Sequence, residues 1–143
     1  MKKKVILVVG ALLVLVLVIF GFNSYQKSLG DDSSKNINIK IQTSENVILN
    51  EKFKTNAKTL EELLIELNQN KNIILEYQDS EYGMYITGLG KDELFKENPS
   101  EGLYWTFESS NNKVCLENEF CPAASSLEIA DGDEFSFNLI SYE

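Results

Sequence analysis

Two cysteines, Cys115 and Cys121, are the residues whose type and spacing most directly define a chemistry in this chain. Five residues separate them, enough to close a small loop, and Pro122 follows at a tight return of the chain. A redox-active pair is the alternative, but such pairs typically show C-x-x-C spacing and nearby cations that lower the thiol pKa. The pattern therefore predicts a structural disulfide in a part of the chain that lies outside the cytoplasm.

Three acidic residues within four positions, Asp131, Asp133 and Glu134, raise the question of a calcium site. They fall well short of the twelve-residue ligand loop of an EF-hand. Asp and Gly tolerate left-handed backbone conformations, so Asp131-Gly132-Asp133 is better explained as a turn before a last strand. We predict a turn here and no metal site.

The chain contains no histidine, which removes the usual general base, the Ser–His and Cys–His pairs and the commonest zinc ligand. Carboxylate pairs of the glycosidase kind are the remaining route to catalysis. Most glutamates, however, fall in polar stretches such as Glu61-Glu62 and 97–101, which are typical of solvated faces and loops. A small domain with one helix leaves little room for a sugar-sized cleft, so we expect no enzyme.

Charge excludes a further class of function. The chain has no arginine and a net charge of −9, so it would be repelled by nucleic acid and lacks the bidentate group that phosphate recognition prefers. Without Lys2, Lys3 and Lys4, ten lysines remain against 22 acidic residues, a net charge of −12 for the rest of the chain.

Those three lysines precede an uninterrupted apolar run, Val5 to Phe22, of 18 residues. As a helix it would span about 27 Å, close to the ~30 Å hydrocarbon core of a bilayer. The lysines should stay in the cytoplasm, which sends the C-terminus outward. We predict residues 1–22 as cytoplasmic lysines and an uncleaved transmembrane anchor in the lipid bilayer; a cleaved signal peptide and a buried core helix are the alternatives.

Residues 23–36 then form a polar, flexible tether, and residues 37–143 a single domain. Thr59 and Glu62 form a capping box before leucines at helical spacing, so a helix starts here and ends at 68–70. Hydrophobic alternation and turn residues predict strands, at 37–41, 47–53, 73–77, 82–89, 103–108, around Val114, 127–129 and 134–142, with a charged loop at 91–101. This order predicts an α+β fold: a β-grasp-like sheet with one covering helix.

The aromatic residues are the candidates for ligand contact. Alternation in 103–107 places Trp105 on a face with Leu103 and Phe107, which is typical of a core, although a ligand-facing role stays open. Tyr85 and Tyr104 are out of phase with the large apolar residues of their strands, and tyrosine combines apolar area with a polar tip. We take Tyr85, Tyr104 and Trp105 as candidate ligand-binding residues.

Several short motifs together resemble the transcobalamin-like C-terminal domain, a family found in bacterial surface proteins and largely without assigned function. They are Thr59-Leu60-x-x-Leu63-Leu64, Tyr85-Ile86-Thr87-Gly88-Leu89, Gly102-x-Tyr104-Trp105 and Asp131-Gly132-Asp133. In vertebrate cobalamin carriers the similar domain forms one wall of the corrinoid site and a helical domain forms the other. The Cys115–Cys121 insertion departs from the simpler loop of that pattern.

The resemblance implies an extracellular, non-catalytic binding module whose ligand is a corrinoid such as cobalamin or another small molecule. No resident cofactor is expected, and an envelope or transport protein is the implied partner. The alternative is a structural or protein-interaction module of the cell envelope. We expect a single-pass protein of the cell membrane with its C-terminal domain outside; the lysine-rich, arginine-free composition is typical of an AT-rich Gram-positive source.

Overall fold

The structure is a computed structural model that describes residues 6, 8–18 and 34–142. The chain divides into two compact units, Met1–Ser34 and Lys35–Glu143. In the first unit, residues 8–18 are helical and their side chains are exposed.

The predicted membrane span 5–22 lies partly outside the described residues, as does most of the predicted tether 23–36. Within residues 6, 8–18 and 34–142, we find no helix that is both long and apolar enough to cross a membrane. The anchor stays a prediction from the sequence.

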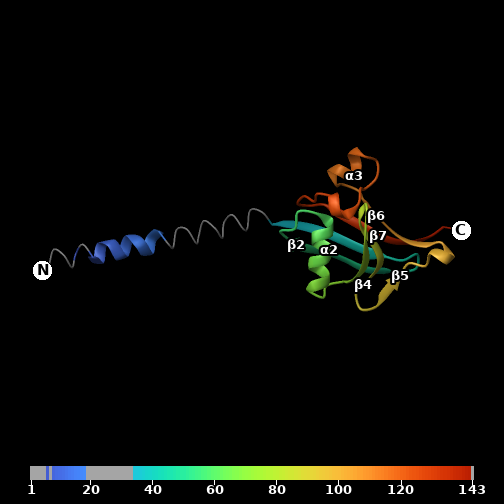
Figure 1. Ribbon diagram of the computed structural model, residues 1–143, viewed down its shortest axis with the longest axis horizontal. Helices are drawn as coiled ribbons and strands as arrows, with labels where there is room; N and C mark the ends of the chain where they lie inside the picture. The colour runs from blue at the N-terminus through green and yellow to red at the C-terminus, as the bar shows by residue number, and fades with distance from the viewer. Residues whose placement is uncertain (1–5, 7, 19–33, 143) are drawn as a thin grey trace. The chain divides into compact units, whose positions relative to one another are not determined.

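The second unit is an α+β domain, as predicted, but its strands form two sheets rather than one. The larger sheet has the strand order β2-β1-β7-β6 and the smaller has the order β3-β4-β5. Figure 1 labels β2, β6 and β7 of the larger sheet and β4 and β5 of the smaller. The elements in chain order are β1 (Lys35–Gln42), β2 (Val47–Thr55), α2 (Leu60–Gln69), β3 (Ile74–Ser80), β4 (Gly83–Gly90), β5 (Leu94–Lys96), a 3-10 turn (Pro99–Glu101), β6 (Leu103–Ser109), α3 (Lys113–Glu117), a second 3-10 turn (Ala124–Ser126) and β7 (Glu134–Ser141).

The first and last strands of this unit lie side by side at the centre of the larger sheet. β1 and β7 run parallel, with Ile39 opposite Phe135 and Ile41 opposite Phe137. Because side chains alternate along a strand, one face of the pair is apolar and fully buried, while the opposite face carries polar residues such as Lys40 and Ser136. The sheet therefore has one core face and one open, polar face.

Helix α2 packs into the core, and the sequence encodes its start. The Thr59 hydroxyl accepts a hydrogen bond from the Glu62 N–H (3.3 Å), and the Glu62 carboxylate accepts one from the Lys58 N–H (2.8 Å). This is the predicted capping box, except that the return bond is made with Lys58, the residue before the N-cap, rather than with Thr59. Four leucines of the helix are buried, each worth about 2 kcal/mol of hydrophobic stabilisation.

Three local predictions were wrong. The segment around Val114 forms helix α3, because the Asn112 side chain caps it by accepting a hydrogen bond from the Cys115 N–H. Residues 127–129 form no strand; they make a single bridge to Thr59, at the start of α2. The charged loop contains the short strand β5, which pairs with β4.

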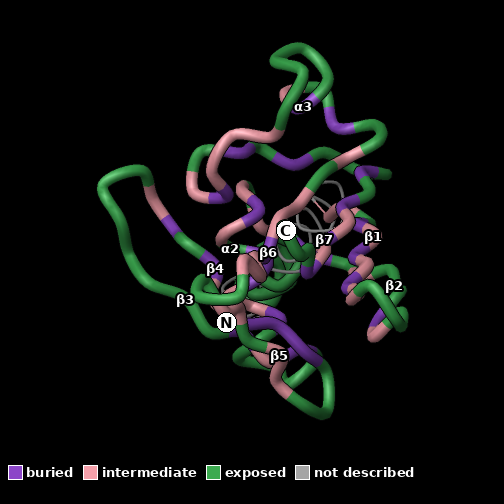
Figure 2. Tube along the Cα trace, turned by 90° about the vertical axis from the view of Figure 1, so that its right-hand side faces the viewer, coloured by how far each residue is buried: buried purple, intermediate pink, exposed green. Residues whose placement is uncertain are grey.

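Burial along the chain follows the arrangement of the strands and helices. Figure 2 shows buried residues along β1, β4 and β7, whereas residues 113–123, which we call the α3 segment, lie at the top of the view and are mostly exposed. Gly90 lies where β4 turns toward β5, and a Cβ there would meet the Glu93 carbonyl oxygen at 1.8 Å. Only glycine lets these two backbone segments approach so closely.

Candidate functional site

Tyr85 lies close enough to Tyr104 to feel its charge, Tyr85 is hydrogen-bonded to Glu97, and the rings of Tyr104 and Tyr142 are neighbours. We call these four residues the aromatic edge. Tyr85 is 42% exposed, and its hydroxyl donates a hydrogen bond to the Glu97 carboxylate (2.8 Å). Glu97 follows β5 and is held in turn by its N–H, which donates to the Thr87 carbonyl of β4 (2.9 Å).

The electrostatics of this pair follow from that bond. The Glu97 carboxylate raises the pKa of Tyr85 from 10.0 to about 12, because ionisation would break the hydrogen bond. Partial burial and the negative charge of Glu97 act in the same direction, with a smaller contribution from Tyr104. Tyr85 is therefore a neutral hydrogen-bonding group at any physiological pH.

Tyr104 completes the edge from the open face of the larger sheet. Its ring lies 6.2 Å from that of Tyr142, centroid to centroid, at an interplanar angle of 57°. Gly102 positions Tyr142: its carbonyl accepts a hydrogen bond from the Tyr142 N–H (2.8 Å), and its φ of +70° is left-handed. The turn before β6 therefore brings the end of the chain beside Tyr104.

Trp105 is a different kind of residue from the two tyrosines. Its side chain is only 8% exposed, and its indole N–H donates to the Phe95 carbonyl (2.8 Å). Tyr85 and Trp105 both line a small cavity of about 100 Å³ between β4 and β6. The structure thus brings the three predicted residues together, with Trp105 in the core, and Tyr85 and Tyr104 toward solvent.

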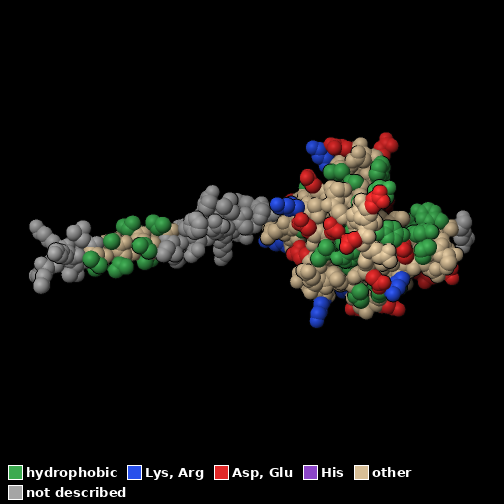
Figure 3. Space-filling view, viewed as in Figure 1, with side chains coloured by type: hydrophobic (Ala, Val, Ile, Leu, Met, Phe, Trp, Pro, Cys, Tyr) green, Lys and Arg blue, Asp and Glu red, His purple; other side chains and the backbone are tan. Residues whose placement is uncertain are grey.

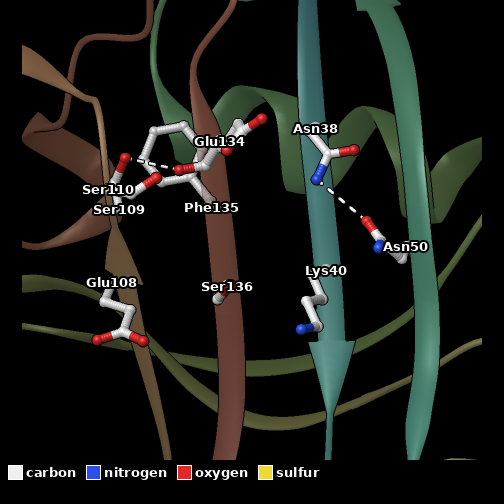
Figure 4. Close-up of a pocket in the computed structure, with 9 residues that line it drawn as sticks. All are labelled: Asn38, Lys40, Asn50, Glu108, Ser109, Ser110, Glu134, Phe135 and Ser136. Atoms are coloured by element: carbon white, nitrogen blue, oxygen red, sulfur yellow. Dashed lines mark hydrogen bonds between the residues drawn. The ribbon is translucent and has the colours of Figure 1, made fainter.

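A larger hollow that the sequence analysis missed lies on the open face of the larger sheet (Figure 4). We call it the sheet hollow; its volume is about 510 Å³. It is lined mainly by polar side chains of all four strands, among them Asn38, Lys40, Asn50, Glu108, Glu134 and Ser136. The sequence does show that polar residues alternate with apolar ones in these strands. Which of those polar residues share one surface, however, depends on the order of the strands in the sheet.

The Asp131–Glu134 segment is a turn, as predicted. Asp133 is buried, and its carboxylate accepts hydrogen bonds from the Asn112 side chain (2.7 Å) and the Ala130 N–H (2.9 Å). The Asp131 carboxylate accepts one from the Asn36 N–H (2.7 Å). Among the residues that the structure describes, no group of three or more His, Cys, Asp or Glu could hold a metal ion.

The predicted disulfide between Cys115 and Cys121 is confirmed. It closes the α3 segment, whose exposed apolar residues are Leu116 (57% exposed) and Phe120 (70% exposed). Acidic side chains are spread over the visible surface of the domain rather than gathered in one patch (Figure 3).

Neither a known protein family nor a curated protein matches this sequence. Solved structures do match its fold. One is a protein of Ruminococcus gnavus described as a putative metal binding protein, with 23% identity and a TM-score of 0.55, covering 76% of this chain and 99% of that chain. Another is haptocorrin in complex with Cbi, with 15% identity and a TM-score of 0.61, covering 78% of this chain and 26% of that chain.

At such low identity the likeness is one of fold. The likeness to haptocorrin supports, at a coarse level, the transcobalamin-like fold that the sequence motifs predicted. This chain spans about a quarter of the haptocorrin chain that it matches.

Proposed function

We propose that the second unit is a non-catalytic binding module for a corrinoid, presented outside the cell by an N-terminal membrane anchor. The similarity of its fold to haptocorrin, a protein solved in complex with Cbi, supports a ligand of this class. The observation that carries the proposal is the aromatic edge. Its tyrosine rings, two of them exposed and that of Tyr104 half-buried, offer apolar area with polar tips, which suits a flat macrocycle that bears amide side chains.

The size of the cavities decides how such a ligand would lie. The cavity beside Trp105 holds about 100 Å³, well below the roughly 300–1,000 Å³ of ordinary ligand pockets. A corrinoid would therefore rest on the aromatic edge rather than enter the cavity beside Trp105. One of its faces would stay open, so a second envelope or transport protein would complete the site.

Calorimetric titration of the full chain, in a mild non-ionic detergent, with cobinamide and cobalamin tests this proposal. Tyr85→Ala and Tyr104→Ala should each weaken binding about tenfold, the cost expected for losing a ring contact and its hydrogen bond. Tyr77→Ala is the matched control, because Tyr77 is a comparably exposed strand tyrosine on β3, outside the aromatic edge.

Quenching of Trp105 fluorescence gives a second readout, since Trp105 is the sole tryptophan of the chain and lies beside Tyr85 in the small cavity. Absence of saturable heat with both corrinoids would refute the proposal. Equal losses in the Tyr77 variant and the edge variants would refute the assigned site.

A module that binds another protein of the cell envelope is the second candidate function. The α3 segment favours it, because the disulfide holds Leu116 and Phe120 in exposed positions beside Glu117 and Glu119. Replacing both apolar residues with serine should abolish crosslinking to an envelope partner and leave corrinoid binding unchanged.

A further inference from the structure

The register of the larger sheet arranges the side chains of the sheet hollow in rows. Asn50 lies opposite Lys40, Lys40 opposite Ser136, and Ser136 opposite Glu108, so one row crosses all four strands. A neighbouring row contains Asn38 and Glu134. The rows lie on the face away from the buried side chains of β1 and β7, and Figure 4 shows them on one surface.

The charged groups of this surface are held apart. Ser136 separates Lys40 from Glu108 by two strand spacings of about 4.8 Å each, or about 10 Å in all. Within the described part of the chain, the side chains of Lys40, Glu108 and Glu134 form no hydrogen bond or ion pair with another residue.

The amides are partly engaged and partly free. The Asn38 side chain donates to the Asn50 side-chain oxygen (3.1 Å), which fixes both amides and leaves the Asn38 oxygen and the Asn50 nitrogen for a ligand. A second hollow of about 510 Å³ continues along the same face and shares Glu108. The surface therefore has room for an extended molecule.

The chemistry of the lining selects the class of ligand. Two carboxylates against one ammonium disfavour an anion, and no group of described residues could hold a metal ion. Phe135 belongs to the lining, yet its side chain is buried on the core face, so the hollow offers little apolar wall. Hydroxyl groups, which both donate and accept, fit a surface of alternating carboxylates, amides, serines and one ammonium.

We infer that the sheet hollow binds a neutral oligosaccharide, with its hydroxyl groups bridging Lys40 and Glu108 across Ser136. A sugar ring is about as long as the strand spacing of about 4.8 Å, so successive sugars would meet successive strands. This site lies apart from the aromatic edge, and none of the four edge residues lines the sheet hollow.

Calorimetry of the full chain with cellohexaose and chitohexaose, and with an anionic uronic-acid hexamer, tests the inference. The neutral hexamers should bind and the anionic hexamer should not. Lys40→Ala and Glu108→Gln should each weaken binding about tenfold, because hydrogen bonds to charged groups are the strong ones. Ser136→Trp should abolish binding by filling the hollow from the central strand.

Lys113→Ala is the matched control, since Lys113 lies in α3 and outside the hollow. Urea unfolding of every variant checks the fold. If Ser136→Trp unfolds the domain, Lys40→Ala still tests the inference, because it only shortens an unpaired surface side chain. Failure of both neutral hexamers to bind, unchanged binding by the Lys40, Glu108 and Ser136 variants, or preference for the anionic hexamer would overturn the inference. Corrinoid binding by the same variants should stay at the wild-type level. Failure of the oligosaccharide inference can therefore be distinguished from failure of the proposed corrinoid function.

Discussion

The Tyr85 phenol donates a hydrogen bond to the Glu97 carboxylate, and the effect of this bond on the Tyr85 pKa can be measured. Because the folded chain holds the Tyr85 proton up to about pH 12, whereas an unfolded chain releases it near the ordinary 10.0, the interaction stabilises the fold fully below pH 10. That contribution is lost as the pH rises from 10 to 12. Ultraviolet titration of tyrosinate should therefore show one of the six tyrosines ionising near 12.

Tyr85→Phe should remove this late step, and Glu97→Ala should move it back toward 10.0, since Glu97 is the main cause of the raised pKa. Glu101→Ala serves as the control carboxylate, because it lies in the neighbouring 3-10 turn without a bond to Tyr85. A late step that survives in the Glu97 variant would contradict the assignment.

Asn112 connects the α3 segment to the Asp131–Glu134 turn. It is 1% exposed; its side chain donates to Asp133 (2.7 Å) and the Glu128 carbonyl (3.0 Å) and accepts from the Cys115 N–H (3.0 Å). Asn112→Ala would leave buried groups without partners, so we expect a loss of about 2–3 kcal/mol in the free energy of unfolding.

Urea denaturation measures this loss. Asn118→Ala is the control, because that exposed side chain makes one bond, to the Val114 carbonyl, and its removal should cost less than about 0.5 kcal/mol. Equal effects of the two substitutions would show that the buried network contributes nothing beyond a surface amide.

Residue-level predictions from the sequence succeeded where a strict alternation was available. The period-2 pattern around Trp105 correctly favoured a core position, with Tyr104 on the opposite face. Glu97 and Tyr142 were missed because they join Tyr85 and Tyr104 through chain turns, at 97–103 and after β7, that no local pattern describes.

Among the elements, the turn before β6 depends on glycine in two ways. Gly102 has a left-handed φ of +70°, and a Cβ there would also meet the Tyr142 carbonyl oxygen at 2.3 Å. Gly102→Ala should therefore cost about 1–3 kcal/mol for the backbone conformation, and more for displacing Tyr142 from Tyr104.

Gly132→Ala separates these two effects. Gly132 has a φ of +89°, but a Cβ there would meet nothing within 4 Å. Urea unfolding should show the larger loss for Gly102, and only Gly102→Ala should also weaken corrinoid binding. If Gly132→Ala costs as much as Gly102→Ala, the close approach to Tyr142 has no energetic role.

The α3 segment shows what a disulfide does for one element. Helix α3 is too short to be stable alone, and the Cys115–Cys121 bond limits its unfolded states. Replacing both cysteines with serine should lower the free energy of unfolding by about 2 kcal/mol, the value expected for so short a loop.

Hydrogen exchange should locate the effect. Faster exchange confined to residues 113–123, with the larger sheet unchanged, would agree with a local role. Faster exchange throughout the larger sheet would show that the disulfide supports the whole core instead.

Element predictions failed where tertiary context outweighed propensity. The sequence predicts a short strand around Val114, but the Asn112 cap and the disulfide select a helix. Strand β5 was not predicted within the charged segment at 91–101. Only three of its residues pair with β4, and an alternation of apolar and polar residues cannot be detected over so short a stretch.

For the whole molecule, the decisive feature is the parallel pairing of β1 with β7, which joins opposite ends of the domain. Local patterns identified both strands but could not give their order, and so could not show that Lys40, Ser136 and Glu108 share a surface. The division into two sheets was missed for the same reason. Strand order depends on contacts distant in sequence, which a single sequence does not display.

The placement of the chain in the cell is the prediction that concerns the molecule as a whole. Lys2–Lys4 should hold the N-terminus in the cytoplasm while the apolar run 5–22 crosses the bilayer, which leaves the acidic domain outside. In intact Gram-positive cells, added protease should then remove the domain, and thiol tagging should find Cys115 and Cys121 oxidised. Deleting residues 5–22 should keep the domain in the cytoplasm, protected from protease and with both thiols reduced. Free thiols or protection of the full chain would contradict an external domain, whereas release of the domain into the medium would replace the anchor with a cleaved signal peptide.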